Sequence, residues 1–66
     1  MTLTINGERV DLPDGSTLAE LVTSWAPAVR GVAAAVDGAV VPRGTWTQVA
    51  LCEGQQVELL TAVQGG

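Results

Sequence analysis

The sequence predicts a small α+β domain in which one amphipathic helix covers a β-sheet. Two tight-turn dipeptides, Asn6-Gly7 and Asp37-Gly38, each lie between segments with the composition of strands. A single stretch, residues 18–25, has apolar residues at helical spacing. The chain has 66 residues, of which 47% are hydrophobic and 15% charged, so it is long enough for one domain and too apolar to be a disordered acidic tail.

The first element is a β-hairpin. Thr2 to Ile5 alternate polar with apolar residues, Asn6-Gly7 follows as a hairpin turn, and a second alternating stretch runs from Arg9 to Leu12. The turn residues therefore predict two short antiparallel strands at the start of the chain.

The helix follows Pro13, Asp14 and Gly15, which interrupt the alternation. Either Ser16 or Thr17 can cap it, and Thr17 with Glu20 has the spacing of a capping box. Its apolar face comprises Leu18, Leu21, Val22 and Trp25. Pro27 lacks a backbone donor, so we expect the helix to end near Ala26.

The second half of the chain predicts two or three further strands. Val32–Val36 forms one strand, and Asp37-Gly38 turns the chain into residues 39–41, where Pro42 stops regular pairing. Residues 43–51 indicate turns rather than a regular element, with Trp46, Val49 and Leu51 expected to cover an edge of the core. Glu53-Gly54 marks another turn, and residues 57–61 are apolar enough for a central strand.

These elements combine into a mixed sheet of four to five strands packed on one main helix. A right-handed crossover would let the first and last strands pair in parallel at the centre of the sheet. The apolar face of the helix would then pack on Leu3, Ile5, Val57 and either Leu59 or Leu60. We expect one folded domain, residues 1–61, followed by a flexible tail, residues 62–66.

Composition excludes several classes of function. The net charge is −4 and the only cationic side chains are Arg9, Arg30 and Arg43, which does not suit binding to nucleic acid. No apolar run approaches the length that spans a membrane, so the cytoplasm is the expected location. Cys52 is single and cannot form an intramolecular disulfide, and with no His in the chain nothing marks it as reactive.

Other candidate sites have ordinary structural explanations. Asp11 with Asp14, and Glu53 with Glu58, could be read as carboxylate pairs, but turn and exposed-strand positions account for all four. Trp25 and Trp46 are expected in the core or at its edge rather than as an aromatic binding platform. The sequence contains no nucleotide-binding glycine loop, no Cys and His pair and no cluster with metal-ligand spacing, so we expect no bound cofactor, no metal and no catalytic residue.

The last residues are the candidate functional segment. Gly65 and Gly66 lack Cβ atoms, so a chain that ends in them is thin enough to pass through a narrow channel and bring a carboxylate to a buried site. A carboxylate becomes open to nucleophilic attack once it is coupled to a leaving group such as AMP. Because this chain lacks the residues for that step, the activating enzyme must be a partner that binds ATP and Mg²⁺.

The whole sequence resembles the family of sulfur carrier proteins of thiamin thiazole synthesis, the ThiS family. The resemblance is carried by Ile5-Asn6-Gly7-Glu8, Leu18-Ala19-Glu20-Leu21, residues 32–43, Trp46, Gly54, residues 57–60 and the closing Ala62-Val63-Gln64-Gly65-Gly66. The part of the resemblance most specific to this family is Val41-Pro42-Arg43 followed by Trp46 and by the final Ala-Val-Gln-Gly-Gly. Two departures are visible: the segment 51–55 replaces a more usual charged turn, and Ala34 and Ala35 thin the middle strand.

This resemblance implies a ubiquitin-like β-grasp fold and a carrier role without catalysis. It implies that an E1-like adenylyltransferase adenylates Gly66 with ATP and that Gly66 is then converted to a thiocarboxylate, with sulfur from a donor such as a cysteine desulfurase. The thiocarboxylate would deliver sulfur to thiazole synthase, a TIM-barrel partner. Gly65, Gln64 and Val63 are the tail residues expected to contact these partners.

Three alternatives remain compatible with the sequence. The small subunit of molybdopterin synthase shares the chemistry and the tail, but resembles residues 40–64 less. A ubiquitin-like protein modifier would carry Gly66 in isopeptide linkage to lysine, and an interaction module of the same fold would leave Gly66 unchanged.

Overall fold

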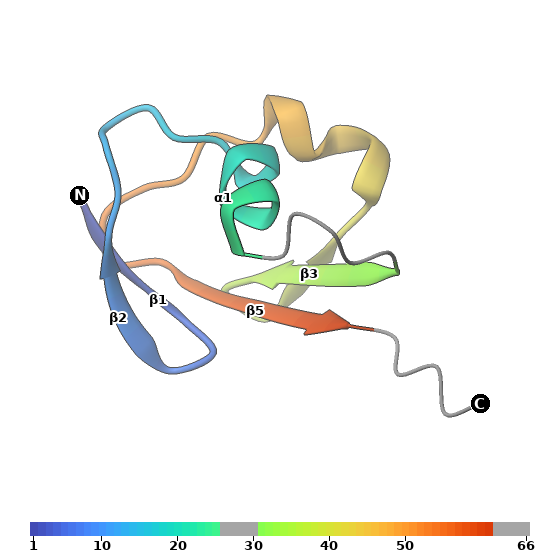
Figure 1. Cartoon of the computed structure of the whole chain (residues 1–66), viewed down its shortest axis with the longest axis horizontal. Coiled ribbons are helices and arrows are strands. Elements are labelled where there is room, and N and C mark those ends of the chain that lie inside the picture. The colour runs from blue at the N-terminus through green and yellow to red at the C-terminus, as the bar shows by residue number, and fades with distance from the viewer. Residues whose placement is uncertain (26–30, 62–66) are drawn as a thin grey trace.

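The computed structural model describes residues 1–25 and 31–61. The elements in chain order are the strands β1 (Thr2–Ile5) and β2 (Glu8–Asp11), the helix α1 (Leu18–Trp25), the strands β3 (Val32–Val36) and β4 (Ala39–Val41), the 3₁₀ helix η1 (Arg43–Gln48) and the strand β5 (Gln56–Thr61). The five strands form one sheet in the order β2-β1-β5-β3-β4. Figure 1 shows α1 and η1 together on one side of this sheet.

The parallel pairing predicted for the first and last strands is present. β1 and β5 run parallel, with Thr4 opposite Gln56 and Ile5 opposite Val57. All other pairs are antiparallel, and β5 lies at the middle of the order between β1 and β3. The mixed five-stranded sheet with one covering helix confirms the predicted architecture.

Both predicted hairpin turns have the backbone that their residues favour. Asn6 and Gly7 have φ of 51° and 85°, and Asp37 and Gly38 have φ of 50° and 85°. Two consecutive positive φ angles define the type I′ turn, whose twist matches that of the flanking strands. These turns fix the registers in which Ile5 lies opposite Glu8 and Val36 lies opposite Ala39.

The capping box of α1 forms as predicted, with Thr17 as the capping residue. The Glu20 backbone N–H donates to Thr17 Oγ1 (3.2 Å), and the Thr17 backbone N–H donates to Glu20 Oε1 (2.8 Å). Ser16 instead donates its hydroxyl to the carbonyl of Pro13 within the preceding turn (2.7 Å). Two backbone donors at the helix start are thereby satisfied.

Trp25 is the exception to the predicted apolar face of the helix. Leu18, Leu21 and Val22 are buried, whereas Trp25 is 41% exposed and packs neither in the core nor at its edge, so the prediction for Trp25 is wrong. Trp25 is the last residue of an eight-residue helix, about 10 Å along the axis from Leu18. At that distance it lies beyond the buried cluster that the rest of the stripe joins.

The buried core lies between the sheet and the two helical segments. It comprises Leu3, Ile5, Leu18, Leu21, Val22, Ala34, Trp46, Leu51, Val57 and Leu59. Of the two leucines expected to meet the helix, Leu59 does so and Leu60 does not. The segment 43–51, read from the sequence as turns, contains the 3₁₀ helix η1, which buries Trp46; the indole Nε1 donates to the carbonyl of Val41 (2.9 Å).

Candidate functional site

The tail residues singled out from the sequence, Val63, Gln64, Gly65 and Gly66, lie outside the described residues. So does the predicted boundary between a domain ending at residue 61 and the tail. What the structure does place is β5, the strand that leads to them, and the surface around its carboxyl end.

The side chains of β5 divide strictly between the two faces of the sheet. Val57 and Leu59 are each 1% exposed and face the helix, whereas Glu58 and Leu60 face outward. Leu60 is 69% exposed, although it directly follows one of the most buried residues in the protein. The carboxyl end of β5 therefore presents an apolar side chain, Leu60, to solvent.

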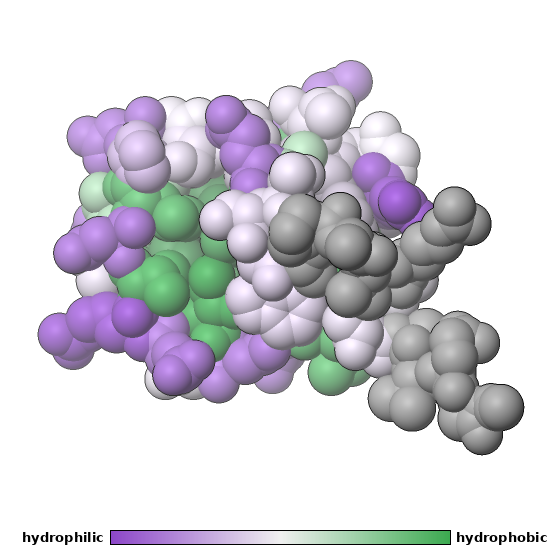
Figure 2. Space-filling model, viewed as in Figure 1, coloured by the Kyte–Doolittle hydropathy of each residue, from purple (hydrophilic) through white to green (hydrophobic). Residues whose placement is uncertain are grey.

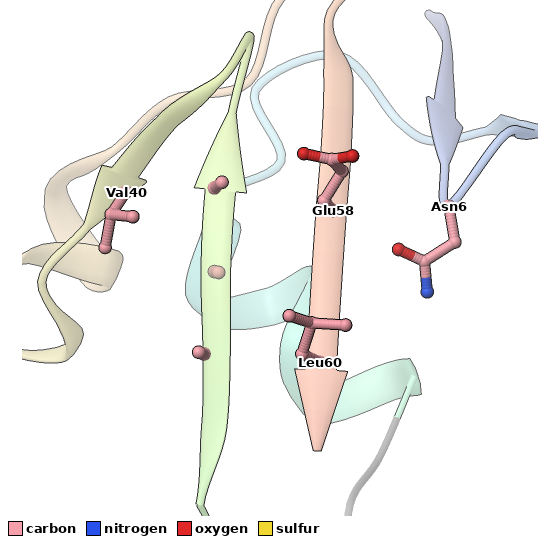
Figure 3. Close-up of a pocket in the computed structure, with 7 residues that line it drawn as sticks. Asn6, Val40, Glu58 and Leu60 are labelled. Carbon is pink, nitrogen blue, oxygen red and sulfur yellow. The ribbon is translucent and has the colours of Figure 1, made fainter. Parts of the chain in front are cut away.

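A shallow depression of about 200 Å³ lies beside Leu60 on the open face of the sheet. Its floor is formed by alanines of β3, and register places Ala33 opposite Leu60, and Ala35 opposite both Glu58 and Val40. Figure 3 shows Val40 on β4 on one side of β3, with Glu58 and Leu60 on β5 on the other. The small side chains noted in the sequence as thinning the middle strand thus leave a hollow with apolar walls.

Val40 gives the second wall of this hollow. It is 79% exposed. Within residues 1–25 and 31–61, the large hydrophobic residues that are exposed are Val40, Leu60 and Trp25. The exposed Val40 and Leu60 both line one hollow and are not scattered singly over the surface. Val40 and Leu60, with the carboxylate of Glu58 beside them, thus form one small apolar patch on the open face of the sheet.

The position of β5 is held by side chains from both hairpin turns. The Asn6 side chain donates Nδ2–H to the Leu59 carbonyl (3.0 Å), and its Oδ1 accepts from the Leu59 backbone N–H (2.9 Å). Asp37 Oδ1 accepts from the Gln56 backbone N–H (2.9 Å). The sequence predicted both residues as turn formers only, because no local pattern shows which distant strand a turn side chain will reach.

Three of the four acidic residues considered as carboxylate pairs, Asp11, Asp14 and Glu53, bond separately within the fold. Asp11 accepts from the Thr2 hydroxyl (2.6 Å), Glu53 accepts from the Thr2 backbone N–H (2.9 Å), and Asp14 lies 3.2 Å from the amino group of Met1. Across residues 1–25 and 31–61, no group of three or more His, Cys, Asp or Glu side chains is arranged to hold a metal ion. Cys52 is a free, exposed thiol.

A second hollow lies between the hairpin and the helix. It is lined by Leu12, Pro13, Ser16, Glu20, Leu21 and Ser24. Figure 2 shows apolar surface between the β1–β2 hairpin and α1, bordered by hydrophilic residues, and Figure 1 places that region toward the opposite end of the molecule from the carboxyl end of β5. Of these two hollows, the open-face hollow is therefore the one beside the carboxyl end of β5. No helix in the described part of the chain is long and apolar enough to cross a membrane.

Comparison with known proteins gives matches over the full chain. The model of the ThiS family matches residues 2–66. The sulfur carrier protein ThiS of Escherichia coli strain K12 is 29% identical over 66 residues, covering all of both chains. The crystal structure of the thiamine biosynthesis protein ThiS from Geobacter metallireducens superposes with a TM-score of 0.83 at 26% identity, again over the whole of both chains. The fold is thus the β-grasp that the resemblance implied, and the chain belongs to the ThiS family.

Proposed function

We propose that this chain is a sulfur carrier protein of thiamin thiazole synthesis and that Gly66 is the residue modified. The Gly66 carboxylate attacks the α-phosphorus of ATP on an E1-like adenylyltransferase, and pyrophosphate leaves. Hydrosulfide, which a thiol reductant releases from the persulfide of the sulfur donor, then attacks the carbonyl carbon of the acyl adenylate, and AMP leaves. The resulting thiocarboxylate donates its sulfur to thiazole synthase.

The observation that carries this proposal is the extent of the family match, which includes both the folded domain and Gly65-Gly66. The proposed chemistry takes place on the carboxylate of Gly66, a residue without a side chain, so the chain supplies a substrate group rather than a catalyst. ATP and Mg²⁺ are accordingly assigned to the adenylyltransferase, and the sulfur to a donor such as a cysteine desulfurase. All of these partners work in the cytoplasm in this proposal.

The open-face hollow supports docking of the adenylyltransferase next to the tail. Six residues of chain span at most about 20 Å, so an enzyme that encloses Gly66 must also approach Leu60. Leu60 and Val40 offer it an apolar anchor, and Glu58 offers a charge that a basic side chain can pair with. The net charge of −4 would favour the approach to a basic surface at low ionic strength.

The tail itself would bind in an extended form. A segment that follows a strand can lie along a groove, where backbone hydrogen bonds supply affinity and side-chain pockets supply selectivity. Val63 and Gln64 are then the side chains closest to the reacting carboxylate that the enzyme can recognise, and Gly65 and Gly66 occupy the narrow part.

Intact mass spectrometry tests this proposal. The protein is incubated with an E1-like adenylyltransferase of thiamin synthesis, ATP, Mg²⁺ and a sulfide donor, and the expected product has one oxygen replaced by sulfur at Gly66. The variant Gly66→Ala should retain the wild-type melting temperature and form neither the adenylate nor the thiocarboxylate. Normal AMP transfer to Gly66→Ala would overturn the proposal.

A second measurement separates this pathway from the alternatives. The thiocarboxylate form should support thiazole formation by thiazole synthase and should rescue a thiamin auxotroph that lacks its own carrier. Rescue of a molybdenum-cofactor auxotroph alone would assign the chain to molybdopterin synthesis, and recovery of Gly66 in isopeptide linkage to lysine would assign it to protein modification.

A further inference from the structure

The side chain of Asn6 occupies the place where another residue of β1 would pair with β5. The parallel ladder places Ile5 opposite Val57, and the Asn6 backbone N–H donates to the Val57 carbonyl (2.8 Å). The main chain then turns away into β2 at Gly7. The next paired position along β5 is Leu59, whose N–H and C=O both meet the Asn6 amide.

Both hydrogen bonds to Leu59 are needed because of its place in the strand. Neighbouring residues of a strand direct their backbone groups to opposite sides. Gln56 accepts from Asp37 on the β3 side, whereas Val57 and Leu59 bond on the β1 side. Without Asn6, the part-buried N–H and C=O of Leu59 would lose the partners that β1 itself no longer provides.

Comparison with Asp37 shows why position 6 carries an amide. At Gln56 only the backbone N–H needs a partner from the turn side chain, because the Gln56 carbonyl already accepts from the Asp37 backbone N–H (2.8 Å). A carboxylate, which can only accept, is therefore sufficient at position 37. Leu59 presents a donor and an acceptor together, and the Asn6 amide matches both with one planar group. A carboxylate at position 6 would place an oxygen against the Leu59 carbonyl oxygen.

We infer that Asn6 is a positioning residue for the sulfur-carrier reaction, because its side chain extends the β1–β5 ladder to Leu59 and so holds the strand from which the tail leaves. Figure 3 shows Asn6 beside the end of β5 that carries Leu60. On its other side this end of β5 is held by β3, through the pairs Ala33–Leu60 and Val32–Thr61. Without the Asn6 hydrogen bonds, the end of β5 would be held by its pairing with β3 alone.

The effect of Asn6 on adenylation rests on the proposed function. A β5 end that frays must be ordered again when the activating enzyme binds Leu60 and the following residues, which weakens binding and leaves the chemistry at Gly66 unchanged. The expected signature is a higher KM for the carrier in adenylation with kcat unaltered.

Asn6→Gly tests this role, because glycine adopts the positive φ of the turn without strain and lacks only the amide. Since Asn6 also lines the open-face hollow, Leu59 exchange is measured beside the KM to separate fraying of β5 from loss of a direct contact. We expect Leu59 amide hydrogen exchange to accelerate about ten-fold or more, and the KM for the carrier to rise roughly three- to ten-fold, with kcat unchanged. Asp37→Gly is the matched control: it removes the side-chain bond at the start of β5 from the same turn type and should leave the KM as in wild type.

Asn6→Asp is the second variant, in case the glycine variant folds poorly. It keeps the acceptor for the Leu59 N–H and loses the donor, so Leu59 protection should fall at neutral pH and recover below about pH 4, where the protonated carboxyl can donate to the Leu59 carbonyl. Equal KM increases in Asn6→Gly and Asp37→Gly would overturn the inference, as would an unchanged KM in Asn6→Gly with Leu59 exchange accelerated. If wild-type protein is not adenylated at all, the proposed function fails, and the exchange measurement still reports on the contact.

Discussion

Leu59 and Leu60 are adjacent, chemically identical side chains with opposite surroundings. Leu59 is 1% exposed and packs in the core beneath the helix, and Leu60 is 69% exposed beside the alanines of β3. The alternation of a strand is sufficient to produce this difference. The pair shows that an apolar residue in this strand stabilises the fold on one face and remains available for recognition on the other.

The same contrast extends over the two faces of the sheet. The helix side holds Leu3, Ile5, Ala34, Val57 and Leu59, all buried. The open side holds the hollow between Val40 and Leu60, with Glu58 beside it. Substitutions on the helix side should therefore act on stability, and those on the open side should act on partner binding.

The largest effect on stability is expected from Leu59→Ala. Removing a fully buried leucine side chain from a core should lower the free energy of unfolding by about 2–5 kcal/mol, and in a domain of this size that is a large part of the total. Urea denaturation followed by tryptophan fluorescence measures it. Leu60→Ala is the control and should change the unfolding free energy by less than about 0.5 kcal/mol. A similar decrease of the unfolding free energy in both variants would contradict the distinction between the two faces of the sheet.

Leu60→Asp should give the converse result. The exposed position tolerates a charge, so the unfolding free energy should stay close to that of wild type, while the KM for adenylation should rise about ten-fold or more because the apolar anchor is lost. Steady-state adenylation kinetics with the carrier as varied substrate measures this. Thr23→Asp adds the same charge to an exposed position on α1 and controls for net charge; an equal KM increase there would mean that charge alone is responsible.

A smaller effect is expected from filling the hollow with Ala35→Leu. The new side chain would project between Glu58 and Val40, occupying space that a partner side chain is proposed to enter, and the KM should rise by about three- to ten-fold. Thermal melting should shift little, because the position lies on the open face. Ala39→Leu, at an exposed position on β4 outside the hollow, is the matched substitution and should leave adenylation unaffected; wild-type kinetics in Ala35→Leu would show that no partner group enters the depression.

Local patterns were sufficient for most of the elements. Each type I′ turn is encoded by two neighbouring residues, and the capping box by Thr17 and Glu20 three positions apart, so both could be predicted without knowledge of the fold. The 3₁₀ helix at Arg43–Gln48 was not predicted as an element, because six residues give too few repeats for a periodic signal. Trp25 was misplaced because helical spacing defines a face but not where the covering sheet ends.

The candidate site was predictable only in part. The terminal glycines and the resemblance indicated the tail, while the open-face hollow arises from Ala33, Val40 and Leu60, which come from three strands and have no shared pattern in the sequence. The role of Asn6 was hidden for the same reason, since its partner Leu59 lies 53 residues away.

The sequence by itself determined the two hairpins, the helix with its cap, and the last strand as a central apolar run, because these depend on residues within a few positions of one another. The tertiary structure alone decided that Leu59 rather than Leu60 meets the helix, that Val40 and Leu60 share one hollow, and that Asn6 continues the ladder of β1. These depend on which strands become neighbours, and the order β2-β1-β5-β3-β4 is set by burial of the whole core rather than by any one segment.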